Sequence, residues 1–304
     1  MSSIEKAIQK LQKKKKDSGG QLSGTLNSRS SSDANRSIPD AFVDEEEFLA
    51  TRIQSTQSQQ TRRQVTIDLQ RLEQRGMLTP DRMHSVMAEE FRGIKRPLIS
   101  NAFATGALAI DKGNLLMVTS ALPGEGKTFI SVNLAMSIAM EKDKTVLLVD
   151  TDSSKTGVSS LLGISPEPGL TDYLLDDSIN LSDLLVRTNI PKLTLLPSGR
   201  YNDRVSELMA SQNMKRLISD LSQRYPDRVV VFDSPPILAT SEARVLTDLV
   251  GQVVFVVAAE DTAESAVKDA MEYLDKTRPI GLVFNKKIQS LGTGYNYYGY
   301  GAEK

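Results

Sequence analysis

The chain is constrained most by residues 115–128, which read LLMVTSALPGEGKT. The first four of these residues have the length and apolar character of a buried strand, and a turn that contains Pro123, Gly124 and Gly126 follows them. From Lys127 onward, apolar residues recur at the spacing of a helix. A glycine-rich loop between a strand and a helix is the context that distinguishes a phosphate-binding loop from a chance match.

Such a loop can bind a polyphosphate, because its backbone N–H groups and those of the helix N-terminus form a concave positive site. We predict that it binds ATP through Pro123, Gly124, Glu125, Gly126, Lys127, Thr128 and Phe129. Lys127 should lie along the β and γ phosphates, and the hydroxyl of Thr128 is placed to ligate Mg²⁺. Ala121 stands where a Walker A motif has its first glycine. The alternative, a glycine-rich turn capping an ordinary helix, requires GKT to follow an apolar run by chance.

Composition excludes several classes of function. The 37 basic residues nearly balance the 38 acidic ones, so overall charge gives no reason to expect a nucleic-acid partner. Without cysteine there is no thiol catalysis and no cysteine-bound zinc, and the single histidine, His84, cannot form a multi-histidine metal site. No apolar stretch approaches the ~20 residues that span a bilayer. We therefore expect a cytoplasmic protein.

The chain divides into four predicted segments. Residues 1–16 form a basic amphipathic helix, which suits either an anionic membrane or a partner, or is simply a solvated helix that frays. Residues 17–63 form a polar linker, to which we assign no structure except a possible turn of helix near residues 48–53, because so polar a segment does not offset its ordering entropy. Residues 64–289 form the P-loop domain, and residues 290–304 a flexible tail.

Strands and helices alternate after the phosphate loop, which predicts an α/β fold with a doubly wound, mostly parallel sheet and helices on both faces. Together with the strand before the phosphate loop, the predicted strands are Leu115–Val118, Val146–Val149, Leu193–Pro197, Val229–Phe232, Val253–Val257 and Ile280–Phe284. The predicted helices between them are Ser206–Tyr225, Ser241–Leu249 and Ala263–Lys276. Before the loop, a helix within residues 67–78 is followed by a second from Asp81 to about Lys95, ending before Pro97.

Two predicted strands end in aspartate. VLLVDTD supplies Asp150 and Asp152, and VVVFDSPP supplies Asp233. Ligands of open α/β sheets bind beyond the carboxyl ends of the strands, and Mg²⁺ takes one or two carboxylates together with phosphate oxygens and water. We expect Thr128 with some of these aspartates to bind the metal, and a remaining carboxylate to accept a proton. Singly, an aspartate at a strand end is more often a cap or turn residue.

The motifs SALPGEGKT, VLLVDTD and VVVFDSPP, in this order and spacing, resemble the Walker A, Walker A′ and Walker B motifs of bacterial tyrosine kinases. The resemblance continues through GISPEPGLTDYL, LPSGRYNDRVSELMAS and GLVFNK. IDLQRLEQRGMLTP and AEEFRGIKRPL look most like the subgroup from exopolysaccharide loci that accompany exosortase sorting systems. The family has a P-loop NTPase fold related to the MinD and ParA ATPases.

The resemblance implies roles for individual residues. The catalytic set it implies is Lys127, Asp150, Asp152 and Asp233, and the metal set is Thr128, Asp152 and Asp233. Asn285 matches an asparagine that contacts adenine in related ATPases. The family's oligomerisation motif E-x-x-R-x-x-R falls on Glu89, Arg92 and Lys95, with lysine in place of the last arginine and thus without its bidentate geometry. Ser154 stands where the family usually has an arginine.

The C-terminal sequence GTGYNYYGYGAEK places its tyrosines among glycines, which suits a flexible tail better than a core. At ~3.3 Å per residue, the tail can extend on the order of 40 Å, far enough to enter a neighbouring subunit's site. In the family such a cluster is the autophosphorylation tail. The predicted phosphoacceptors are Tyr295, Tyr297, Tyr298 and Tyr300. An aromatic tail without function is the alternative.

These observations predict an ATP- and Mg²⁺-dependent protein-tyrosine autokinase that acts on its own tail, between subunits, and regulates exopolysaccharide synthesis or export. The resemblance implies a homo-oligomer such as a ring, a separately encoded membrane activator that determines chain length, and a cognate phosphatase, with the kinase near the inner face of the membrane. A MinD- or ParA-like ATPase switch is the main alternative. It is disfavoured because Leu122 stands where such switches carry a second lysine. A nucleotide-binding scaffold without catalysis is the third possibility.

Overall fold

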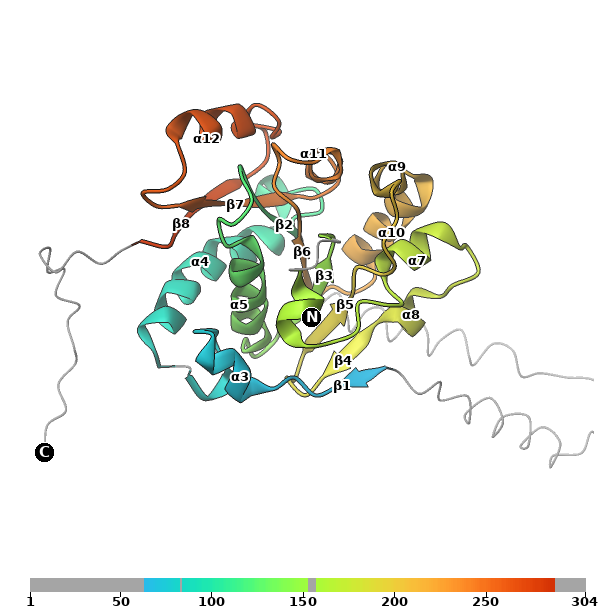
Figure 1. The fold of residues 1–304 in the computed structure, drawn as a ribbon, viewed down its shortest axis with the longest axis horizontal. Helices are drawn as coiled ribbons and strands as arrows, with labels where there is room; N and C mark the ends of the chain where they lie inside the picture. The colour runs from blue at the N-terminus through green and yellow to red at the C-terminus, as the bar shows by residue number, and fades with distance from the viewer. Residues whose placement is uncertain (1–62, 83, 153–156, 288–304) are drawn as a thin grey trace, which may run out of the picture. The chain divides into compact units, whose positions relative to one another are not determined.

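A computed structural model describes residues 63–82, 84–152 and 157–287. Within these ranges the centre is an eight-stranded sheet in the order β1-β4-β5-β3-β6-β2-β7-β8 (Figure 1). The strands are β1 (Gln64–Val65), β2 (Leu115–Ser120), β3 (Thr145–Asp150), β4 (Val186–Thr188), β5 (Leu193–Leu196), β6 (Arg228–Asp233), β7 (Gln252–Ala258) and β8 (Ile280–Asn285). Neighbouring strands run parallel except β4 and β5. The predicted mostly parallel P-loop fold is confirmed.

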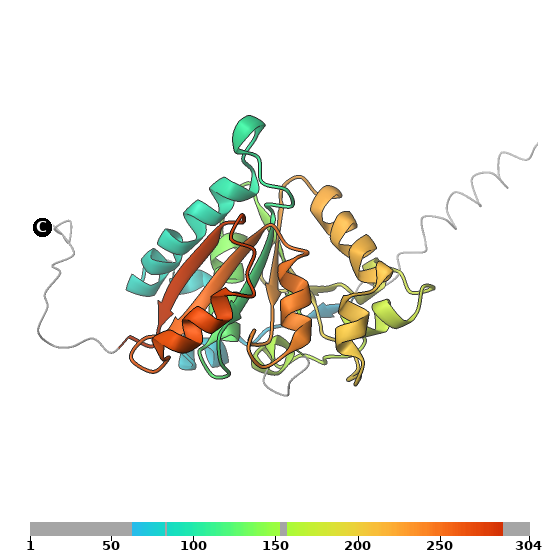
Figure 2. The same cartoon turned by 90° about the horizontal axis from the view of Figure 1, so that it is seen from above.

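Helices cover both faces of the sheet (Figures 1 and 2). They are α3 (Leu69–Gln74), α4 (Val86–Ala102), α5 (Lys127–Ala139), α6 (Val158–Leu162), α7 (Leu170–Leu175), α8 (Leu181–Leu184), α9 (Val205–Met209), α10 (Gln212–Gln223), α11 (Ser241–Thr247) and α12 (Glu264–Met271), with short 3₁₀ turns η1 (Pro80–Arg82) and η2 (Gly106–Leu108). Successive residues of a central strand belong to two apolar clusters, as Leu116 and Met117 show. This two-sided burial explains why the central strands are nearly continuous runs of Val, Leu and Phe.

Helix α4 does not end before Pro97, as the sequence predicted, but continues to Ala102. A proline inside a helix costs about 3 kcal/mol, because it removes one backbone donor and crowds the preceding turn. Phe91 and Leu98 are buried on either side of Pro97, and each such burial is worth roughly 1.5–3 kcal/mol. Packing of the apolar face therefore keeps the helix intact.

Two further predictions about elements were wrong, and two short strands were not predicted. The single helix predicted over Ser206–Tyr225 is split into α9 and α10, because Ser211 is extended and its hydroxyl accepts a hydrogen bond from Met214 N. The helix predicted over Ala263–Lys276 is shorter, since α12 ends at Met271. The short strands β1 and β4 on one side of the sheet were not predicted, since two or three residues carry too little periodicity.

The predicted helix over residues 1–16, residues 17–62 of the predicted linker and the tail over residues 290–304 lie outside the described residues. Ser154, which departs from the family pattern, lies outside them too. Among the helices of the described ranges, none combines the length and the apolar character that a membrane crossing requires.

Candidate active site

The phosphate loop connects the end of β2 to the start of α5, as predicted. Pro123 and Gly124 form the middle of a tight turn, and Gly124 has a φ of 82°, which a residue with a side chain rarely adopts. Gly126 has a φ of 97° and directly precedes the first turn of α5. The two glycines therefore allow the chain to fold back and to present the N-terminus of α5 toward a ligand.

Asn285, at the end of β8, contacts the phosphate loop directly. Its Nδ2 donates a hydrogen bond to the backbone oxygen of Glu125 at 2.9 Å. A Cβ atom on Gly126 would overlap the Asn285 amide, so a side chain at position 126 would displace that amide, and the positive φ of this residue favours glycine as well. The predicted adenine contact thus lies beside the loop, and its amide nitrogen supports the loop.

Lys127 begins α5, and only 7% of its surface is exposed. Burial lowers the pKa of its ammonium, while the nearby charges of Asp233, Asp152 and Glu125 act in the opposite direction. A polyphosphate bound beside this buried ammonium would favour its charged form, as the nearby carboxylates already do. The position and environment of Lys127 fit the predicted role.

Asp233 ends β6 and is fully buried. Its two carboxylate oxygens accept hydrogen bonds from two hydroxyls of α5, Thr128 Oγ1 at 2.8 Å and Ser131 Oγ at 2.7 Å. Burial raises the pKa of Asp233 to about 6, although both hydroxyls stabilise the ionised form. The structure therefore brings together two of the predicted metal ligands, Thr128 and Asp233.

Asp150 ends β3 and lies directly opposite Asp233 in the register of the two strands. It is also buried, and it accepts hydrogen bonds from Ser159 Oγ at 3.1 Å and from the backbone N–H groups of Ser159 and Asp152, both at 3.2 Å. Burial raises the pKa of Asp150 to about 8, and the charge of Asp233 adds to this shift. Two adjacent buried carboxyls with raised pKa values form a site in which a cation would be strongly stabilised.

Asp152, the third predicted carboxylate, is half-buried, and its charge acts on both Lys127 and Asp233. In the described parts of the chain, no cluster of three or more His, Cys, Asp or Glu side chains is arranged to hold a metal ion. The hydroxyl of Thr128 and the carboxylate of Asp233 are nevertheless hard oxygen donors in direct contact, which suits Mg²⁺. Phosphate oxygens and water would have to complete its shell.

Some residues of the site were not predicted. Ser131 lies one helical turn after Thr128, so the i, i+3 spacing could have indicated that it shares a face with it. Ser159 and Gly157 gave no signal, because their contacts with Asp150 depend on how the chain returns after β3. A Cβ on Gly157 would lie 3.0 Å from Asp150 Oδ2. The backbone at position 157 therefore encloses this carboxylate.

The predicted oligomerisation residues on α4 differ in exposure. Glu89 and Arg92 form an ion pair on the surface of the helix. Lys95 instead is 5% exposed, and its Nζ contacts Ser137 O and Glu141 Oε1 of the α5 region, both at 2.7 Å. The third residue of the motif thus binds within its own subunit, and only the first two lie on a surface that a neighbour could contact.

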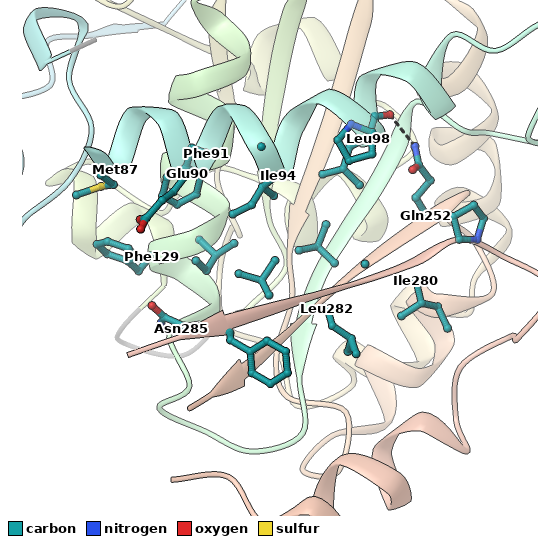
Figure 3. A pocket seen from close by; sticks show the side chains of 18 of the residues that line it. Met87, Glu90, Phe91, Ile94, Leu98, Phe129, Gln252, Ile280, Leu282 and Asn285 are labelled. Carbon is teal, nitrogen blue, oxygen red and sulfur yellow. Dashed lines mark hydrogen bonds between the residues drawn. The ribbon is translucent and has the colours of Figure 1, made fainter. Parts of the chain in front are cut away.

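A groove of about 990 Å³ lies between α4 and the edge strand β8 (Figure 3). Met87, Phe129 and Asn285 line the end of the groove that adjoins the phosphate loop, and Gln252 lines the other end. The side chain of Phe129 therefore points toward α4, so a contribution of Phe129 to phosphate binding would have to come from its backbone. Asp150 and Asp233 do not line the groove.

The fold and the site together define a P-loop nucleotide-binding protein. A family model described as AAA domain matches residues 115–289. Tyrosine-protein kinase YwqD of Bacillus subtilis (strain 168) is 32% identical over 229 residues, which are 74% of this chain and 92% of that protein. The chain therefore belongs to the bacterial tyrosine kinases, and it is a protein-tyrosine kinase.

Further relatives agree with this family. Tyrosine-protein kinase wzc of Salmonella typhimurium (strain LT2) is 32% identical over 62% of this chain but only 26% of its own length. The solved kinase domain of the Escherichia coli tyrosine kinase ETK has a TM-score of 0.58 and 28% identity, covering 70% of this chain and 80% of that one. The chimerical protein CapA2B2 has a TM-score of 0.59 and 25% identity, covering 74% of this chain and 93% of that one.

Proposed function

We propose that this kinase uses ATP and Mg²⁺ to phosphorylate the tyrosines of its own C-terminal tail, Tyr295, Tyr297, Tyr298 and Tyr300. One observation carries the proposal: Lys127, Thr128, Asp150 and Asp233 meet at one edge of the sheet, in a chain of a tyrosine kinase family. The same chain ends in clustered acceptor residues. Enzyme and substrate are therefore encoded together.

Each residue has a distinct role in the proposed transfer. Lys127 and the N-terminus of α5 bind the phosphates, while Thr128, Asp152 and Asp233 hold Mg²⁺, which neutralises phosphate charge when bound. The bond from the γ phosphorus to the bridging oxygen of ADP breaks as the bond to the tyrosine oxygen forms. Asp150, once ionised, accepts the phenolic proton. A cation beside Asp150 favours the ionised carboxylate and so prepares it for this step.

The possible reach of the tail and the family support transfer between subunits. We propose a homo-oligomer, such as a ring, that uses Glu89 and Arg92 on the exposed face of α4, while Lys95 fixes that helix to α5. Each phosphate adds up to about two negative charges, so a phosphorylated tail is repelled by the acidic site and leaves it. Assembly and phosphorylation would then be coupled.

The names of the relatives support a proposal about the biological role. We propose that the kinase regulates exopolysaccharide synthesis or export, next to the inner face of the membrane, with a separately encoded membrane activator and a cognate phosphatase. The names of the relatives support a capsule-type role, since a putative tyrosine-protein kinase CapB of Staphylococcus aureus is 30% identical over 72% of this chain. Adding the candidate activator should increase phosphorylation without changing the tyrosines that are used.

The test is a mixing experiment with labelled ATP and Mg²⁺. Lys127→Met with an intact tail is mixed with a protein whose four tail tyrosines are replaced by phenylalanine, and labelled peptides are mapped by mass spectrometry. Label on the tail of Lys127→Met supports transfer between subunits. If the wild type labels its own tail but the mixture of the two variants contains no labelled tail, transfer takes place within one chain. Phosphate release without phosphotyrosine supports the ATPase switch, and neither product supports the scaffold.

A further inference from the structure

A closed set of hydrogen bonds joins the phosphate loop to the ends of β7 and β8. Its centre is Glu125, whose carboxylate is buried with 3% of the residue exposed. One oxygen, Oε2, accepts from Leu122 N at 2.6 Å, across the turn of the phosphate loop. The other oxygen, Oε1, accepts from the hydroxyl of Thr262, in the loop after β7. One side chain thus closes the turn and ties it to a loop that is 137 residues away in sequence.

Asn285 completes the connection from the other side. Its side chain donates to Glu125 O at 2.9 Å, while its own backbone oxygen accepts from Ala259 N at 2.8 Å. Thr262 is itself fixed to the end of β7, because its hydroxyl accepts from Ala258 N at 3.2 Å and its N–H donates to Ala258 O at 3.0 Å. The phosphate loop is therefore held at Glu125 by two independent segments.

Charge alone does not explain a carboxylate at this position. Glu125 places a buried negative charge next to a site for an anionic polyphosphate, which opposes nucleotide binding. A carboxylate does offer two acceptor oxygens, and here each oxygen meets a donor from a different loop. The geometry of the side chain, rather than its charge, accounts for its place in the loop.

We propose that Glu125 and Thr262 are positioning residues, which hold the phosphate loop in the shape that binds ATP and so couple that loop to the end of β7. This inference rests on the proposed binding of ATP by the phosphate loop. Neither residue touches the reacting atoms. Without the bond between them, the loop samples other shapes, and only a fraction of the molecules can bind ATP at once.

The test compares matched variants by their dissociation constant for MgATP, measured by calorimetry well below the unfolding temperature. Thr262→Val removes the hydroxyl with little change of shape, and Glu125→Ala removes both acceptors. We expect Thr262→Val to weaken binding by about tenfold, the usual effect of losing one hydrogen bond to a charged group, and Glu125→Ala to weaken it more, because it also loses the bond from Leu122 N. Thr262→Ser keeps the hydroxyl and should bind like the wild type.

Two further variants separate position from charge and from general destabilisation. Glu125→Gln can still accept from Leu122 N and can donate to the Thr262 hydroxyl, so it should bind MgATP more tightly than Glu125→Ala. The double variant Glu125→Ala with Thr262→Val should be no weaker than Glu125→Ala alone, because both remove the same bond.

Wild-type protein that fails to bind MgATP would overturn the proposed function itself. If the wild type binds but Thr262→Val matches it, the positioning role is wrong. The role is also wrong if Glu125→Gln binds as weakly as Glu125→Ala, because the charge would then be what matters. Additive effects in the double variant would likewise contradict the coupling between the two residues.

Discussion

The two sides of the phosphate loop are built on opposite principles. On the acidic side, Asp150 and Asp233 are buried opposite each other, and burial together with neighbouring carboxylates raises both pKa values. The other side is called the base side here, because it contains Asn285, the predicted contact of the adenine base. On this side, Glu125 and Asn285 form hydrogen bonds that connect the phosphate loop to the ends of β7 and β8. Burial thus opposes the ionisation of both carboxyls on the acidic side, whereas the polar groups of the base side are paired by hydrogen bonds. In the proposed mechanism, the chemistry takes place on the acidic side and the phosphate loop is positioned from the base side.

The largest expected effect comes from breaking the acidic side at Asp233. Asp233→Asn should reduce tail phosphorylation by at least about a hundredfold, because it removes a charge that faces Lys127 and contacts Thr128. Ser131→Ala is the matched control, since it removes only one hydroxyl that donates to the same carboxylate. Initial rates of phosphotyrosine formation measure both. Equal rates for Asp233→Asn and the wild type would contradict the assignment of the acidic side.

Asp150 provides a test of stability against pH in metal-free, nucleotide-free protein. Its pKa is raised from 3.8 to about 8, mainly by burial. The folded state therefore favours the protonated carboxyl, and this contribution to stability is complete below about pH 4 and is lost as the pH rises toward 8. Asp150→Asn carries no charge at any pH. The free energy of unfolding of Asp150→Asn should therefore increase relative to that of the wild type between pH 4 and 8, by up to about 1.4 kcal/mol per pH unit.

Urea unfolding at several pH values, with chelator present, measures this difference. Asp176→Asn is the control, because hydrogen bonds with Ser178 lower the pKa of this exposed carboxyl. It should show no gain over the wild type in this pH window. If the free energies of unfolding of Asp150→Asn and of the wild type depend on pH in the same way, the pKa of Asp150 is not raised in the folded state.

A smaller effect is expected when the base side is broken at Asn285. Asn285→Asp keeps the shape of the side chain but loses the donor to Glu125 O. Binding of MgATP should weaken by several-fold to about tenfold, while the maximal rate of phosphorylation at saturating ATP changes little. Steady-state kinetics separate the two quantities. A loss confined to the maximal rate would show that Asn285 acts in the transfer step, like the residues of the acidic side, and not in binding MgATP.

The smallest effect on catalysis is expected at Lys95, which lies on neither side. Lys95→Met removes the contacts with Ser137 O and Glu141 but keeps the aliphatic stem. The free energy of unfolding should fall by about 1–2 kcal/mol, because Ser137 O loses a charged donor and Glu141 is partly exposed. Glu141→Gln should cost less. A large loss of tail phosphorylation with unchanged stability would instead favour a direct role for Lys95 between subunits.

The sequence alone predicted where the aspartates of the acidic side lie, but it did not predict the hydrogen bonds of the base side. Asp150 and Asp233 end strands that are recognisable by their own composition, and parallel strands bring their carboxyl ends to one edge whatever the loops do. The contact between Glu125 and Thr262 joins two loops, and nothing local in either segment indicates it. Lys95 shows the same limit, because helical spacing places it with Glu89 and Arg92, while packing against α5 turns it inward. Local pattern predicts elements, and contacts between loops depend on the assembled fold.

The most direct test of the account is the mass of the intact protein after incubation with ATP and Mg²⁺. The wild type should gain phosphate groups that map to the tail, whereas Lys127→Met and the protein with phenylalanine at all four tail positions should gain none. Phosphate on the wild type that persists when the tail tyrosines are replaced would contradict the account. So would phosphorylation of purified Lys127→Met when it is incubated alone.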